Sequence, residues 1–373
     1  IAEGVRTVKS LSALLDETDA DPTAAARTAR ARGQRVIGFA NADVPVELID
    51  ASGCFALSLM HCAGGATPHA DRYLEASFSP LDRSIAETWL SGKLELLDAV
   101  VFSRGSDSSQ RLYYYLCELQ RRQLTRGPRP LLFDLAKIPR ASSIAYSYEA
   151  TRELAAALGV QAERLPLSIA RRNRRRALLQ SLQRLRAEAR PPRGTLIERI
   201  SRLADCCEAD ELDTALAHWM REPRPAFSGP RLLLSGSAPR DGTLHAVVEQ
   251  AGGAIIAESG DHDLERLGSP LAADSTDPLR ALSEHYQALP HGARAFIDRA
   301  ADLRRRLESS RAHAVIFWLL EEEEALVWDL PPQQQALQAS RVPALTLTRQ
   351  PSTINEQTLL SLRRFVAQLA SPG

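Results

Sequence analysis

Hydroxyl and carboxylate side chains stand in the loops that follow several apolar segments of the chain. Ser106 and Asp107 follow the apolar segment 98–103, near the start of an expected tyrosine-rich helix. At such a position they would either cap the helix or present polar groups to an anionic ligand. Glu47 lies just after Pro45 at the start of another expected helix, where it would either face a cleft or complement the helix dipole.

Two charged runs offer further candidates. The acidic run 321–324 directly follows an apolar segment, and carboxylates at the ligand edge of a sheet could bind a hard metal ion. The same run lacks the spacing of a calcium loop and would equally form a solvated face. The arginine-rich segment 171–190 carries leucines at helical spacing, which predicts an amphipathic helix with a solvated basic face. Docking of a phosphorylated cofactor is the functional alternative for these arginines.

The sequence contains no self-sufficient nucleophile or metal motif. It has neither an HExxH pattern nor a Ser-His-Asp order, and Ser235-Gly236-Ser237 lacks the lysine and the spacing of a phosphate-binding loop. The five cysteines form no CxxC pair. Cys206 and Cys207 lie in a segment of helical pattern, where we expect them to be core residues.

The composition excludes several classes of protein. Lys+Arg and Asp+Glu both number 46, so the net charge is +0 and a whole-protein nucleic-acid footprint is not expected. No apolar run approaches the ~18 residues of a membrane-spanning helix. The N-terminal residues lack the basic-then-apolar layout of a signal peptide, and we expect a cytoplasmic protein.

The elements that would position these side chains follow from the pattern of apolar residues. Strands are expected at 35–40, 55–60, 98–103, 130–135, 231–235, 254–258, 314–319 and 344–348. Strands that alternate with helices predict parallel sheets, whose ligands lie beyond the carboxyl ends of the strands.

The distribution of these strands predicts an α/β protein with two parallel-sheet lobes and a cleft between them. We expect N-terminal helices over 1–34, a first α/β lobe over 35–146, a helical connector or cap over 147–226, and a second α/β lobe over 227–373. A chain of 373 residues is long enough for two such domains.

An ordered set of segments resembles the 2-hydroxyacyl-CoA dehydratase and benzoyl-CoA reductase family, including the D-component of 2-hydroxyglutaryl-CoA dehydratase. The set comprises PVELI at 45–49, SPLDRS at 79–84, LLDAVVFSRGSDSSQRLYYYL at 96–116, PLLFDLAKIPR at 130–140, SIARRNRRRALLQSLQRLR at 168–186, RLLLSGSAPRDGTLHAVVEQAGGAIIAE at 231–258, VIFWLLEEEEALVWDLP at 315–331 and a closing EQTLLSLRRFVAQL helix. The resemblance covers roughly the whole chain from residue 35.

This resemblance implies two flavodoxin-like lobes and pairing with a homologous subunit as a heterodimer. In the family, three cysteines of a typical subunit hold a 4Fe–4S cluster in the cleft beside an acyl-CoA thioester. A separate ATP-hydrolysing activator supplies one electron, and a ketyl radical then expels the hydroxyl group. In the reductase branch the electrons dearomatise a ring instead.

The sequence departs from the family at all three cysteine positions. The first family cysteine aligns with Ser79, the second with Ser106 before Asp107, and the third, counted back from Pro331, with Glu323. Iron–sulfur clusters are held by thiolates, and oxygen ligands are tolerated one at a time. We therefore expect this chain to bind no cofactor of its own, with a 4Fe–4S cluster in a partner subunit.

Three hypotheses about function remain open from the sequence. The chain could be the cluster-free subunit of a heteromeric complex, supporting an acyl-CoA site with Glu47 and Asp107 as cleft groups. It could instead be a repurposed enzyme that uses oxygen side chains on a related substrate, with a hard metal ion or with none. The third hypothesis is a non-catalytic scaffold or binding protein. A homodimer would favour the second or third hypothesis over the first.

Overall fold

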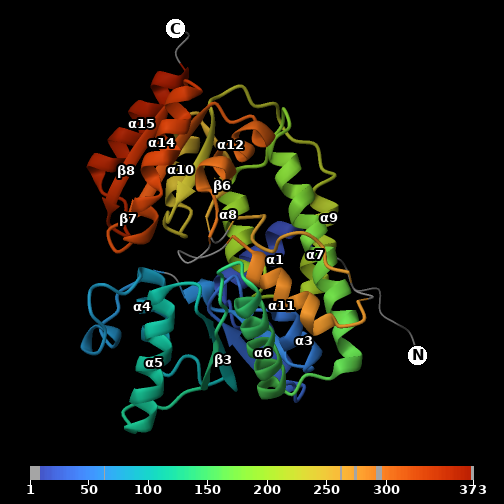
Figure 1. The fold of residues 1–373 in the computed structure, drawn as a ribbon. Coiled ribbons are helices and arrows are strands. Elements are labelled where there is room, and N and C mark those ends of the chain that lie inside the picture. Colours follow the sequence, from blue (N-terminus) through green and yellow to red (C-terminus); the bar gives the residue numbers. More distant parts are fainter. Residues whose placement is uncertain (1–8, 63, 261–262, 273–274, 291–295, 371–373) are drawn as a thin grey trace.

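The computed structural model describes residues 9–62, 64–260, 263–272, 275–290 and 296–370. It contains two four-stranded parallel sheets, each in a lobe of its own, with the long helix α7 (Leu165–Arg186) running along one side of both (Figure 1). The predicted α/β class with two flavodoxin-like lobes is confirmed. None of the helices in the described part of the chain is both long and apolar enough to cross a membrane.

The first sheet contains four of the expected strands in the order β2-β1-β3-β4. Its strands are β1 (Val36–Phe39), β2 (Phe55–Ser58), β3 (Ala99–Ser103) and β4 (Arg129–Phe133). All three pairings are parallel, so the carboxyl ends of the strands meet at one edge. Phe39 at the end of β1 pairs with Ser58 on one side and with Val101 on the other.

The second sheet repeats this topology with the order β6-β5-β7-β8. Its strands are β5 (Arg231–Gly236), β6 (Ala254–Ser259), β7 (Ala314–Leu320) and β8 (Ala344–Gln350). The apolar runs of β3, β6 and β7 arise because parallel strands are covered by helices on both faces. In β3, for example, Val101 faces one core of the first lobe, and Val100 and Phe102 face the other.

Helices cover both faces of each sheet. The α-helices are α1 (Leu11–Ala20), α2 (Ala24–Ala31), α3 (Val46–Ala51), α4 (Pro80–Leu90), α5 (Asp107–Arg121), α6 (Ala141–Leu158), α7, α8 (Gly194–Leu203), α9 (Ala209–Trp219), α10 (Thr243–Gln250), α11 (Pro278–Ala288), α12 (Arg299–Ser310), α13 (Ala325–Trp328), α14 (Leu330–Ala339) and α15 (Glu356–Ala370). Short 3-10 turns lie at η1 (Leu59–Cys62), η2 (Ala70–Arg72) and η3 (Ala162–Arg164). The segment between the sheets is helical, and α7, α8 and α9 share a core with α1.

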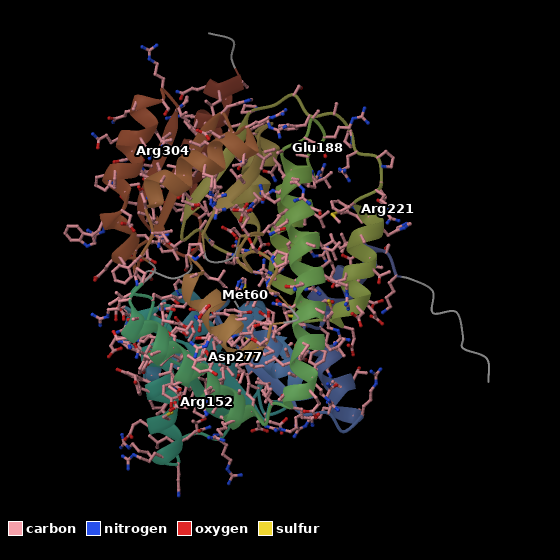
Figure 2. All side chains as sticks on the ribbon, turned by 45° about the vertical axis from the view of Figure 1, so that its right-hand side comes forward. Met60, Arg152, Glu188, Arg221, Asp277 and Arg304 are labelled. Atoms are coloured by element: carbon pink, nitrogen blue, oxygen red, sulfur yellow. The ribbon has the colours of Figure 1, made fainter. Side chains whose placement is uncertain are left out.

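One helix of the second half returns to the first lobe. Helix α11 packs against α6, and its Leu282 and Tyr286 belong to the core on one face of the first sheet (Figure 1). Asp277, the N-cap of α11, accepts a hydrogen bond from the hydroxyl of Tyr148 in α6 at 2.9 Å and lies on the same lobe as Arg152 (Figure 2). The range 227–373, expected to form the second lobe, therefore includes a helix that packs on the first.

The basic face expected on α7 is largely buried rather than solvated. Four of its arginines are at most 7 % exposed: Arg172, Arg175, Arg176 and Arg186. Arg172 pairs with Asp205 at 2.7 Å, and Arg175 pairs with Asp213. The expectation of a wholly wet basic face is wrong for these four because each guanidinium meets a carboxylate from another element.

Two buried ion pairs connect α7 to the two lobes. Arg176 contacts Glu47 of α3 at 2.5 Å, and Arg186 contacts Glu258 of β6 at 3.0 Å. Glu47 is fully buried and also accepts a hydrogen bond from the hydroxyl of Tyr286 at 2.8 Å. Burial opposes ionisation of Glu47, but the guanidiniums of Arg176 and Arg172 hold its pKa below the ordinary value.

The pair between Arg176 and Glu47 predicts a large stability effect. Arg176→Met should lower the free energy of unfolding by about 3–5 kcal/mol, because Glu47 would remain buried without the guanidinium that contacts it directly. The double variant R176M/E47L should recover much of this loss, since it removes both charges. Arg171→Met is the matched control: its ion pair with Asp210 is exposed, and its effect should stay within about 0.5 kcal/mol. Urea denaturation measures all three, and equal effects of R171M and R176M would contradict the prediction.

Asp50 of α3 predicts a pH-dependent stability. Burial raises its pKa to about 6, with the carboxylates of Glu47 and Asp205 adding to the effect and Arg172 opposing it. The folded state therefore binds this proton more tightly than the unfolded chain. This contribution to stability is complete below about pH 4 and is lost as the pH rises through 6.

The variant Asp50→Asn removes this titration. The difference in the free energy of unfolding, variant minus wild type, should increase by about 2 kcal/mol from pH 4.5 to pH 7.5. Urea denaturation of both proteins across this range gives the difference directly. A difference that does not change with pH would show that Asp50 titrates normally.

Candidate functional site

A cavity of about 700 Å³ lies where the carboxyl ends of the two sheets face each other. Its wall in the first lobe comes from the loops after β1 and β3 and from the start of α4. Its wall in the second lobe comes from the loops after β5, β6 and β7. This is the edge at which parallel sheets bind ligands, because successive loops converge there. In Figure 2, Arg152 and Arg304 mark the two lobes, and Met60 lies at the level where the lobes approach each other.

Three positions far apart in the sequence meet in this cavity. Ser79, Ser106 and Glu323 all line it, the first two from the first lobe and the third from the second. These are the residues at which the family resemblance places cysteines. The structure brings them to one cavity although more than 200 residues separate Ser106 from Glu323.

Ser79 is the N-cap of α4. Its Oγ accepts a hydrogen bond from the backbone N–H of Asp82 at 3.1 Å and donates one to Asp82 Oδ2 at 2.7 Å. Its own backbone N–H donates to Ser108 Oγ at 2.8 Å, which joins α4 to α5. Asp82 also lines the cavity, and burial raises its pKa.

Ser106 is the N-cap of α5, as the capping interpretation predicted. Its Oγ accepts a hydrogen bond from the N–H of Ser109 at 3.0 Å. The hydroxyl of Ser109 donates to Asn41 Oδ1 at 2.8 Å, and the same oxygen accepts from the N–H of Ser103 at 2.9 Å. Asn41, which lines the cavity, thus links the loop after β1 to the end of β3 and the start of α5.

Glu323 has a similar role in the second lobe. Its Oε1 accepts hydrogen bonds at 3.2 Å from the N–H groups of Ala325 and Leu326, at the start of α13. Its neighbour Glu322 also lines the cavity, whereas Glu321 and Glu324 are exposed. Within the described ranges, no three His, Cys, Asp or Glu side chains are grouped so that they could hold a metal ion.

Two of the predicted site residues lie outside the cavity wall. Glu47 does not face the cleft, because its carboxylate is fully buried between Arg176 and Tyr286 at the junction of α3, α7 and α11. Asp107 is exposed at the first position of α5 and is not part of the cavity wall. The structure therefore brings Ser79, Ser106 and Glu323 together and separates Glu47 and Asp107 from them.

The sequence did not single out the charged residues at the strand ends of the second lobe. Glu258 lines the cavity and is contacted by Arg186, by His245 Nε2 at 3.2 Å and by Arg240 at 3.5 Å. Burial opposes its ionisation, but Arg186 and His245 hold its pKa well below the ordinary value. Arg240 also lies within 4.0 Å of the buried carboxylate of Glu198. The only sequence signal for Glu258 was its position at the end of a buried strand.

The cavity wall is rich in carboxylates. Those of Asp43, Asp82, Asp241, Glu258, Asp263, Glu322 and Glu323 outnumber the guanidiniums of Arg83, Arg240 and Arg299. Asp43, like Glu258, is nearly inaccessible to solvent at its position in the wall. Three of these carboxylates pair with cations behind the wall: Asp43 with Lys137, Glu258 with Arg186, and Asp263 with Arg306.

The thiols of the chain lie away from this cavity. None of the five cysteines is among the described residues of the wall. Cys54, Cys206 and Cys207 are buried, and burial raises the pKa of Cys62 to about 11 and that of Cys207 to about 12. The donors in the cavity are oxygens, three of which cap helices, so this set does not fit a 4Fe–4S cluster.

Comparisons with known proteins agree with this architecture. The model of the family described as 2-hydroxyglutaryl-CoA dehydratase, D-component, matches residues 41–366. This range includes all the cavity-lining positions discussed above and every strand of both sheets apart from β1. A comparison with curated proteins gives no significant match.

The two serine caps give a direct prediction. Ser79→Ala and Ser106→Ala should each lower the free energy of unfolding by about 1 kcal/mol, since each leaves a helix N-terminal N–H without its side-chain acceptor. Ser361→Ala, on the exposed face of α15, should change it by less than about 0.5 kcal/mol. Thermal or urea unfolding measures all three variants. No difference between the cap variants and S361A would show that the hydroxyls do not act as caps.

Proposed function

Because the chain belongs to the 2-hydroxyglutaryl-CoA dehydratase D-component family, we propose that it is a cluster-free subunit of a dehydratase-like complex. One observation carries this proposal. The three positions at which the family resemblance places cysteines line one cavity, and all three supply oxygen atoms that cap helices.

The chemistry of these side chains supports a cluster-free state. Thiolates are the ligands that iron–sulfur clusters use, whereas a serine hydroxyl at neutral pH is protonated and a carboxylate prefers hard cations. Ser79, Ser106 and Glu323 are also engaged as caps, so binding iron through them would release backbone N–H groups at three helix ends.

The partner is the second part of the proposal. Proteins of this family act in multi-subunit complexes, which supports a partner subunit here. We propose that this partner is a homologous subunit that retains its cysteines, binds the cluster and holds the acyl-CoA thioester. This chain then contributes the other half of the interface and supports the partner's acyl-CoA site.

The open cavity distinguishes among the alternatives. A pure scaffold would have no need of a cavity of about 700 Å³ at the ligand edge of both sheets. The second candidate function is an enzyme that uses oxygen side chains. The presence of Ser79, Ser106, Glu323 and Glu258 in one cavity supports it. Glu47 and Asp107 give this enzyme hypothesis no support, because neither residue is part of the cavity wall.

Purification without air tests the cluster-free proposal. The wild-type chain should be colourless, with substoichiometric iron and no acid-labile sulfide. The matched variant S79C/S106C/E323C restores three thiols at one cavity, and we expect it to gain iron and sulfide on reconstitution. Stoichiometric iron and sulfide in the wild type would overturn the proposal.

Co-purification from the native cell tests the partner. A homologous subunit with its cysteines, recovered in equal amount, is the expected result. A homodimer without such a subunit would contradict the complex and favour the oxygen-based enzyme.

A further inference from the structure

Large apolar side chains of α13 are exposed to solvent next to the cavity wall. Trp328 is 84 % exposed, and Val327, which precedes it, is 40 % exposed. Leu326 and Leu330, which flank these two residues in the sequence, both line the cavity. Single exposed apolar residues are common on protein surfaces, whereas adjacent ones that form a patch mark interaction sites.

A second exposed aromatic residue belongs to the same region. Phe296 is 65 % exposed and lies three residues before Arg299, which also lines the cavity. Arg299 pairs with Asp329 at 2.8 Å, and Asp329 directly follows Trp328. This ion pair brings the segment before α12 beside α13. We call Phe296, Val327 and Trp328 the rim patch.

The rim patch lies among acidic side chains. The described residues of its two segments that carry a carboxylate, none of which is buried, are Asp298, Glu321, Glu322, Glu323, Glu324 and Asp329. The nearby guanidiniums are those of Arg299, which pairs with Asp329, and of Arg349, which lies 3.8 Å from Glu321. Among the described residues, carboxylates therefore outnumber guanidiniums around the patch.

This combination of aromatic and acidic groups determines which kind of partner fits. The carboxylates would repel the phosphates of a nucleic acid and the headgroups of an anionic membrane. A protein surface that offers an apolar pocket flanked by Lys or Arg matches both the indole and the carboxylates. Tryptophan is also among the residues most enriched at the energetic centres of protein interfaces.

We propose that the rim patch is the docking surface for the homologous, cluster-bearing subunit, which presents a basic, apolar pocket to Trp328. This inference rests on the proposed function for the existence of that subunit and adds the surface and its chemistry. Because Leu326, Leu330 and Arg299 of the same segments line the cavity, a partner docked on the patch lies directly beside the cavity wall. A subunit that this chain supports at a shared site must lie there.

A variant of the rim patch tests this docking surface. The chain is mixed with the homologous subunit recovered with it, and sedimentation velocity gives the dissociation constant. Trp328→Ala should weaken association about 30-fold or more, which is the effect of truncating an interface hot spot. Leu167→Ala is the matched control, because Leu167 is a 72 % exposed residue of α7, and it should leave the affinity unchanged.

Charge reversal tests the expected basic pocket. Glu324→Lys should weaken association about tenfold or more, and added salt should weaken association of the wild type. Glu308→Lys carries the same change of charge at an exposed position of α12 in the same lobe, and it should have little effect. Equal affinities of E324K and E308K would contradict a basic pocket.

Tryptophan fluorescence gives a second readout, because Trp328 is the most exposed of the four tryptophans. Trp89 and Trp318 are at most 1 % exposed, and Trp219 is half-buried. Acrylamide should quench a large part of the emission of the free chain, and W328A should lack this part. The bound subunit should protect it, with the W328A mixture as the blank. Unchanged quenching in the complex would show that Trp328 is not at the interface.

The outcomes separate this inference from the proposed complex. If the homologous subunit binds W328A and F296S as tightly as it binds the wild type, the complex stands and the docking surface is wrong. If the wild type is a homodimer that W328A dissociates, the patch binds a second copy and the assigned partner is wrong. If no homologous subunit is recovered and the chain is monomeric, the complex and this inference both fail.

Two anionic probes test the partner class. An RNA oligonucleotide and phosphatidylglycerol vesicles should not bind at the patch, and binding that W328A abolishes would contradict a protein partner. Unfolding curves confirm that each variant is folded. If one is not, the quenching of the wild type with and without the homologous subunit remains decisive.

Discussion

The buried arginines of α7 are the interaction on which the relative position of the two lobes depends. Arg176 pairs with Glu47 in the first lobe, and Arg186 pairs with Glu258 in the second. The two arginines are ten residues apart, so about 15 Å of rigid helix separates the two attachment points. Buried pairs of this kind add little net stability compared with apolar packing, but breaking one leaves an uncompensated charge. They therefore favour one arrangement of the lobes over others.

The cavity is a consequence of this arrangement. Glu258, which Arg186 holds, is itself part of the cavity wall, so the same ion pair attaches the second lobe and orients a charged group toward the ligand space. Helix α11, which belongs to the second half of the sequence, packs on the first lobe. The hydroxyl of its Tyr286 donates a hydrogen bond to Glu47. Two connections between the lobes, α7 and α11, thus support one site.

The three positions at which the family resemblance places cysteines are helix caps in this structure. Ser79 and Ser106 satisfy the N-terminal N–H groups of α4 and α5, and Glu323 does so for α13. Helices that begin at the cavity need acceptors at these positions whatever ligand is bound. Serine and glutamate oxygens serve this purpose well, so the loops can keep their conformations with oxygen in place of sulfur.

The sequence by itself determined the elements and their order. All eight strands were predictable from their short apolar runs, which are continuous in strands such as β3 and β7 that are covered on both faces. Ser106 was predictable as a cap from its local context. The tertiary structure alone decided which charges are buried. The arginines of α7 were expected on a solvated face, and Glu47 was expected at a cleft or at a helix dipole, because local sequence does not show which distant residue will neutralise a charge. For the same reason the pairs of Asp43 with Lys137 and of Asp263 with Arg306 could be recognised only in the folded chain, since burial and charge neutralisation are properties of three-dimensional neighbours.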